Sequence, residues 1–126
     1  MLVYAVPAGG YSAITLIRNG DAFDVIADIR VGRTLMQFVG DSDLFVSVRN
    51  LSQSTTLMNR HSSYPLFPQR SPLTERLRLK FNPGWTASEG DVLEVVATFK
   101  VRAGINHHYS QARSTPFIVS TSMQRA

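Results

Sequence analysis

The clearest strand signal lies in residues 92–102, which read VLEVVATFKVR. Apolar side chains alternate there with Glu94, Thr98, Lys100 and Arg102. Successive side chains on a strand point to opposite faces, so this alternation predicts a β-strand with one buried face. The predicted buried set is Leu93, Val95, Ala97, Phe99 and Val101.

The same alternation recurs in residues 76–81 and 23–31. In residues 76–81 the predicted buried set is Leu77, Leu79 and Phe81, and in residues 23–31 it is Phe23, Val25, Ala27, Ile29 and Val31. Their polar neighbours are Arg76, Arg78 and Lys80 in the first stretch and Asp24, Asp28 and Arg30 in the second. Shorter candidate strands are Leu2 to Val6, Ala13 to Arg18, Thr34 to Val39, Leu44 to Leu51, Thr55 to Met58 and Pro116 to Met123.

Turn residues separate these segments, as at Asn19-Gly20-Asp21 and Gly40-Asp41-Ser42-Asp43. The Asn19-Gly20 pair predicts a hairpin, since both residues tolerate positive φ. About nine short strands with no useful helical period predict an all-β fold, an antiparallel β-sandwich of the jelly-roll type.

The chain has 126 residues, 44% of them hydrophobic, which predicts one domain over residues 1–126 with one core. The stretch from Asn59 to Pro72 carries three prolines and scattered aromatics, so we expect a long loop there. There is no cysteine, which excludes disulfides and cysteine-ligated zinc. No run approaches the ~18 apolar residues of a membrane-spanning helix, and the short apolar start lacks the basic flank of a secretory signal. We therefore expect no membrane insertion.

The histidines do not predict a metal site. His107 and His108 are adjacent, so in a strand they face opposite ways, and His61 has no neighbour in sequence that would complete a set of ligands. Asp41-Ser42-Asp43 lacks the oxygen spacing of a calcium loop, and we expect a turn in which the aspartates bond to backbone amides.

Catalytic chemistry is not indicated either. Asp24 and Asp28 share one strand face, but by strand rise they lie about 13 Å apart, beyond the roughly 5–9.5 Å between paired glycosidase carboxylates. No serine lies in a Gly-x-Ser-x-Gly elbow, and no glycine pattern matches a phosphate-binding loop. We predict that the protein is not an enzyme and uses no cofactor.

Three cations, Arg76, Arg78 and Lys80, alternate along one predicted strand and form a candidate basic face. If Lys100 and Arg102 lie nearby, this face could contact an acidic protein or nucleic acid. Base stacking needs exposed aromatics among the cations, and the aromatics here point inward. We therefore do not expect nucleic acid as a partner; a solvated face or a protein contact remain.

The run Asp43-Leu44-Phe45-Val46-Ser47-Val48-Arg49-Asn50-Leu51-Ser52, followed by Ser63-Tyr64-Pro65-Leu66-Phe67, resembles a pattern in small phage vertex and spike-base proteins such as tectivirus-type penton subunits. The pattern is a strand ending in a polar turn, a short strand, and an aromatic-proline step. The resemblance implies a small jelly roll that oligomerises on a capsid. This chain has His61-Ser62-Ser63 where the family has a glycine-rich link, and the family defines no catalytic residues.

The sequence thus favours a non-enzymatic structural subunit of a virus or phage-like particle, located in the virion after synthesis in the host cytoplasm. Its expected partners are itself, as a homo-oligomer, and a neighbouring shell or tail protein. The loop and the termini, Met1 to Val6 and Phe117 to Ala126, would make the contacts, with Tyr64, Phe67 and Arg70 as anchors. The alternative is a carbohydrate- or peptide-binding module. Its exposed platform would use Trp85, Tyr109 or Tyr11.

Overall fold

The three alternating stretches form long strands in the computed structural model, which describes residues 1–121. Residues 23–31 form β3, residues 73–81 form β6, and residues 92–103 form β7. The elements in chain order are β1 (Leu2–Pro7), β2 (Leu16–Arg18), β3 (Phe23–Val31), α1 (Arg33–Met36), β4 (Val39–Asn50), β5 (Thr55–Pro65), β6 (Leu73–Phe81), β7 (Val92–Ala103), β8 (Asn106–Arg113) and β9 (Phe117–Ser120).

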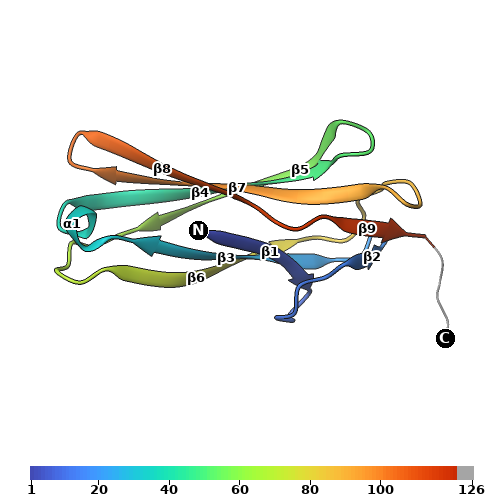
Figure 1. The fold of residues 1–126 in the computed structure, drawn as a ribbon, viewed down its shortest axis with the longest axis horizontal. Helices are drawn as coiled ribbons and strands as arrows, with labels where there is room; N and C mark the ends of the chain where they lie inside the picture. Colours follow the sequence, from blue (N-terminus) through green and yellow to red (C-terminus); the bar gives the residue numbers. More distant parts are fainter. Residues whose placement is uncertain (122–126) are drawn as a thin grey trace.

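The strands form two facing sheets (Figure 1). The smaller sheet has the order β1-β3-β6, and the larger has the order β2-β9-β7-β4-β5 with β8 also paired to β7. The pairings are antiparallel except for β2 with β9, which is parallel. The predicted all-β sandwich is confirmed. The finer expectation of a jelly roll stays a prediction: that topology arranges eight strands in two Greek keys, and here three strands face six.

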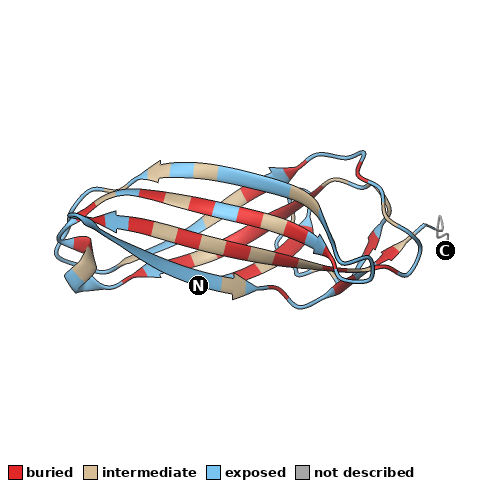
Figure 2. Cartoon of the chain, turned by 90° about the horizontal axis from the view of Figure 1, so that it is seen from above, coloured by how far each residue is buried: buried red, intermediate tan, exposed pale blue. Residues whose placement is uncertain are grey.

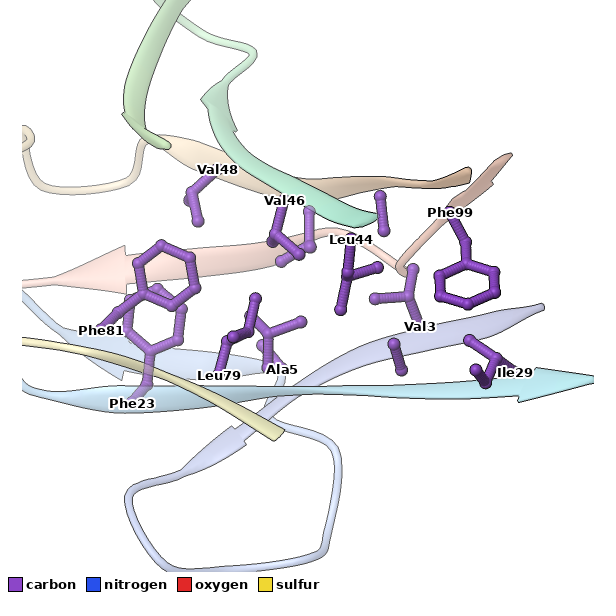
Figure 3. Packing of buried hydrophobic residues seen from close by; sticks show 14 of the residues in the cluster. Val3, Ala5, Phe23, Ile29, Leu44, Val46, Val48, Leu79, Phe81 and Phe99 are labelled. Carbon is purple, nitrogen blue, oxygen red and sulfur yellow. The ribbon is translucent and has the colours of Figure 1, made fainter. Parts of the chain in front are cut away.

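The core lies between the sheets and is built from the inward side chains of the alternating strands, visible as red bands on several strands in Figure 2. At one end of this core Phe23 stacks on Phe81 with ring centroids 5.2 Å apart. Trp85 meets Phe23 edge-on at 6.1 Å, and its Nε1 donates to the carbonyl oxygen of Asp21 at 2.8 Å. Aliphatic side chains such as Leu44 and Val46 continue the core toward the other end (Figure 3).

The smaller sheet is also covered on its outer face, by residues 8–14, which we call the strap. The amide of Gly9 donates to Asp24 Oδ2 at 3.0 Å, and Arg78 donates to the carbonyl oxygen of Gly10 at 2.6 Å. The Arg78 guanidinium lies 4.8 Å from the centre of the Tyr11 ring. Because the strap lies over this face, Asp24 and Ile26 are buried although they point away from the larger sheet.

The expected loop from Asn59 to Pro72 is shorter than predicted, because β5 continues to Pro65 and the loop begins at Leu66. Gly40 to Asp43 is not a turn but part of β4, paired with the end of β5. Both segments are polar, and such a composition is also typical of turns and loops. Backbone pairing, which composition does not report, decides the structure here.

Three further predictions differ from the structure. Residues 34–39 are predicted to form a strand, but the helix α1 (Arg33–Met36) occupies the first half of this stretch. The strand expected from Ala13 shrinks to Leu16–Arg18, and the turn at Asn19-Gly20 joins strands of different sheets rather than closing a hairpin. The last candidate strand is confirmed over Phe117–Ser120, and residues 122–126, part of the predicted contact terminus, lie outside the described residues.

Candidate assembly surface

One end of the sandwich brings together three segments that are far apart in the chain. This is the end that carries α1, at the left of Figure 1. The amide of Gly104 donates to the carbonyl oxygen of Phe38 at 3.2 Å, and the amide of Leu66 donates to that of Gly40 at 3.0 Å. The amide of Gln69 donates to the carbonyl oxygen of Met36, also at 3.0 Å. These bonds hold residues 36–40, 66–69 and 104–105 side by side.

Each of these segments exposes a large apolar side chain. Phe38 is 63% exposed, Phe67 is 75% exposed, and Ile105 is 95% exposed. We call these three residues the apolar end. Next to Phe67, a cleft of about 260 Å³ is lined by Gln37, Pro68, Gln69 and Arg70. Single exposed apolar residues are ordinary, but a group of them on adjoining segments is typical of a contact surface.

The three anchors predicted from the sequence divide between this surface and the core. Phe67 and Arg70 lie in the loop between β5 and β6 and are exposed, at the apolar end. Tyr64 lies in β5, is partly buried, and packs against the core. Its carbonyl oxygen accepts a hydrogen bond from Ser42 Oγ at 2.8 Å. Tyr64 therefore belongs to the edge of the core and not to the exposed surface.

Sequence reasoning missed Phe38 and Ile105. Phe38 falls in a stretch expected to be a strand, and Ile105 sits in the two-residue turn between β7 and β8. The sequence does contain one sign that Ile105 is exposed. Ile105 follows Gly104 at the end of a strongly alternating strand, where a turn is expected, and side chains in turns lie at the surface.

The candidate basic face is largely neutralised by the neighbouring strand. Arg76 Nε lies 2.8 Å from Asp28 Oδ1, and one terminal nitrogen of Arg78 lies 2.6 Å from Asp24 Oδ2. Lys80 stands opposite Asp24 in the register of β3 and β6. These pairs make the face a cross-strand ion ladder rather than an unbalanced positive patch.

Lys100 and Arg102 do not extend this face, because they belong to β7 in the other sheet. Each has its own acidic partner on β4 there. Lys100 Nζ is 3.9 Å from Asp43 Oδ2, and Arg102 is 2.7 Å from Asp41 Oδ1. The condition that Lys100 and Arg102 lie near the candidate basic face is therefore not met.

Asp24 is the most buried ionic group of the ladder, at 2% exposure. Burial by itself would raise the pKa of Asp24, but the Gly9 amide and the Arg78 guanidinium both stabilise the carboxylate. Their combined effect is larger, and the pKa lies below its ordinary value. Asp24 thus stays ionised, and its carboxylate links the strap to β6 because it bonds to both Gly9 and Arg78.

Asp43 organises a second polar group, on the outer face of the larger sheet. It accepts hydrogen bonds from Ser63 Oγ at 2.7 Å and from His61 Nε2 at 2.9 Å, and these bonds lower the pKa of the carboxyl. The His61 ring stacks on Phe45 with centroids 4.4 Å apart. Asp41 and Asp43 therefore bond to side chains, where backbone amides of a turn were expected. Within residues 1–121, no group of three or more metal-ligating side chains comes together.

Of the three aromatic residues named for the alternative binding module, Tyr11 and Tyr109 are exposed and Trp85 is not. Trp85 is buried in the core, at 8% exposure. Tyr11 lies on the strap outside the smaller sheet, and Tyr109 lies on β8 of the larger sheet. The expectation of an exposed indole is wrong, because the ring fills the space beside Phe23.

Fold and surface together define an all-β sandwich with an exposed apolar end. No known protein family matches the chain, and no curated protein matches it in sequence either. Within residues 1–121, no helix is both long enough and apolar enough to span a lipid bilayer.

Proposed function

We propose that the protein is a non-enzymatic structural subunit of a virus or phage-like particle, acting as a capsid, vertex or decoration protein through self-assembly. Its partners are further copies of itself and a neighbouring shell or tail protein. The observation that carries this proposal is the apolar end. The resemblance of residues 43–52 and 63–67 to vertex proteins supports the particle as the setting.

Exposing large apolar side chains to water costs free energy. Burying one large apolar side chain contributes about 1.5–3 kcal/mol, and the three residues of the apolar end are at least 63% exposed. Covering them with a partner recovers much of this free energy. Arg70 beside them supplies a side chain that interfaces favour. A surface of this kind suits permanent contacts, as in a shell.

The test is solution mass, measured by size-exclusion chromatography with light scattering over a range of concentrations at low and high salt. We expect a closed oligomer that resists salt, because apolar contacts are not screened. Phe67→Ser should raise the concentration at which the oligomer dissociates by roughly tenfold or more. Negative-stain electron microscopy should show rings or closed particles for the wild type.

The control is Leu16→Ser, because Leu16 is 61% exposed but lies on β2, at the opposite end of the sandwich. It should leave the oligomer unchanged. A protein that is monomeric at every concentration would overturn the proposal. Ligand screening with glycans and peptides would then be the next step.

A further inference from the structure

We propose that β8 is a second contact element, through which two copies join by antiparallel pairing of one β8 with the other. This inference rests on the proposed function in that both need the chain to associate with itself. It adds the element, the type of partner and the register.

β8 is a long strand with solvent on both faces. It pairs with β7 over eight residues without a register shift, from Val96↔Arg113 to Ala103↔Asn106. Of its residues only Ala112 is partly buried, and the others are exposed. No other strand of residues 1–121 pairs with its far side. That side presents unpaired backbone amides and carbonyls, which are a template for a further strand.

The usual protections of a sheet edge are missing from β8. It has no lysine, proline or bulge, and its one charged residue, Arg113, forms an ion pair with Glu94 at 3.1 Å. Natural proteins use such features to prevent pairing between edges. Their absence over eight residues leaves this edge open.

Of the other edge strands, β2 has only three residues, and β5, β1 and β6 are each obstructed. β5 has a register irregularity where it pairs with Val48 and Arg49, and it ends in Pro65. The free side of β1 is occupied where Ala5 accepts a hydrogen bond from the amide of Ile14 at 2.9 Å. On β6, the carbonyl oxygen of Lys80 accepts a hydrogen bond from Arg60. β8 is therefore the most open strand edge of residues 1–121.

A second copy fits this edge because the strand is complementary to itself. A two-fold axis pairs identical strands, so any charge on the strand would face the same charge nearby. β8 avoids this by being almost uncharged. With Tyr109 opposite itself, His107 faces Gln111 and Ser110 faces His108, and every side chain keeps to its own face of the sheet. The result is one continuous sheet through both copies.

The direction of the backbone groups agrees with this register. A two-residue turn links β7 and β8 and is closed by the pair Ala103↔Asn106. Hydrogen-bonded and non-hydrogen-bonded pairs alternate from there, so the amides and carbonyls of His107, Tyr109 and Gln111 point to the free edge. Tyr109 at the axis can then exchange two hydrogen bonds with its counterpart.

The chain has no cysteine, so a single substitution introduces the only thiol. In a hydrogen-bonded pair the two Cα atoms lie about 5.5 Å apart, within the roughly 4.4–6.8 Å that a disulfide spans. Tyr109→Cys should therefore form a disulfide-linked dimer under mild oxidation, seen on a non-reducing gel. Gln111→Cys is the register control on the same strand and face, and should cross-link at most one-tenth as much. Asn59→Cys, on the edge strand β5, is the control for position.

A second variant tests the contact without oxidation. Tyr109→Lys places like charges on either side of the axis and should weaken association at least tenfold in light scattering, whereas Tyr109→Phe should leave it unchanged. Circular dichroism checks that each variant is folded. Equal cross-linking of Gln111→Cys or Asn59→Cys, or wild-type association of Tyr109→Lys, would overturn the inference.

The two proposals fail in distinguishable ways. A monomeric wild type overturns both. An oligomer that is lost with Phe67→Ser but unaffected by Tyr109→Lys overturns the role of β8 and leaves the apolar end as the assembly surface.

Discussion

Individual residues follow the alternation of the sequence closely, and they depart from it where a distant segment covers them. The five apolar residues expected to be buried in residues 92–102 are all buried. Asp24 is predicted on the polar face of residues 23–31, yet it is buried and bonded to the strap. Periodicity predicts which way a side chain points, but not what the rest of the chain places over it.

The buried pair of Asp24 and Arg78 should make stability depend on acid. The pKa of Asp24 is depressed in the folded protein, so its contribution is present above the unfolded pKa of about 4 and is lost as pH falls through the folded pKa. Asp24→Asn should cost about 2–4 kcal/mol near neutral pH. The difference from wild type should shrink by pH 3, as urea denaturation at both pH values would show.

The matched control is Asp21→Asn. Asp21 is paired with Arg18 at 3.8 Å, and both side chains are 52% exposed, so little change is expected at either pH. A constant difference between Asp24→Asn and wild type across the pH range would contradict the assigned role of the ionised carboxylate.

At the level of elements, the sequence predicts strands that have one buried face and misses strands that are exposed to solvent on both faces. β8 is exposed to solvent on both faces, so its sequence shows no alternation of apolar and polar residues, and the sequence does not predict a strand there. The start of β4 and the end of β5 are polar strands that read as turn and loop. The strap has no regular structure, and it is defined by bonds to residues about 15 and 68 positions away, which no local pattern contains.

Removing the Arg78 side chain should release the strap. Arg78→Ala loses the bonds to Asp24 and Gly10 and the contact with Tyr11 together. We expect amide hydrogen exchange of residues 8–14 to rise at least tenfold while that of β7 stays slow. Arg102→Ala is the control, since Arg102 is 46% exposed and its ion pair is with Asp41 in the larger sheet. Unchanged exchange in the strap of Arg78→Ala would show that other contacts hold it.

For the whole molecule, the sequence predicts the class of fold and leaves the order of strands undetermined. The turn at Asn19-Gly20 suggested a hairpin within one sheet, whereas β2 pairs with β9, the last strand of the described chain. The apolar end is likewise assembled from segments near residues 38, 67 and 105, so its members could be seen in the sequence one at a time but not as a group.

Such pairing between distant segments should make folding slow. Strands with many non-local partners close long loops before they gain contacts, and sandwiches of this kind fold in milliseconds to seconds. Trp85 is the single tryptophan and is buried, so its emission should shift to longer wavelength on unfolding. Stopped-flow fluorescence should give a main refolding phase slower than about 1 ms. A faster main phase would contradict this prediction.

The parallel pairing of β2 with β9 also has a mechanical consequence. Tension carried along the chain enters β2 at Leu16 and leaves β9 at Ser120, which are opposite ends of the paired segment. A pull in this geometry shears the hydrogen bonds of the pair together instead of unzipping them one after another. The short β2–β9 pair would thus act as a clamp that resists force transmitted along the chain.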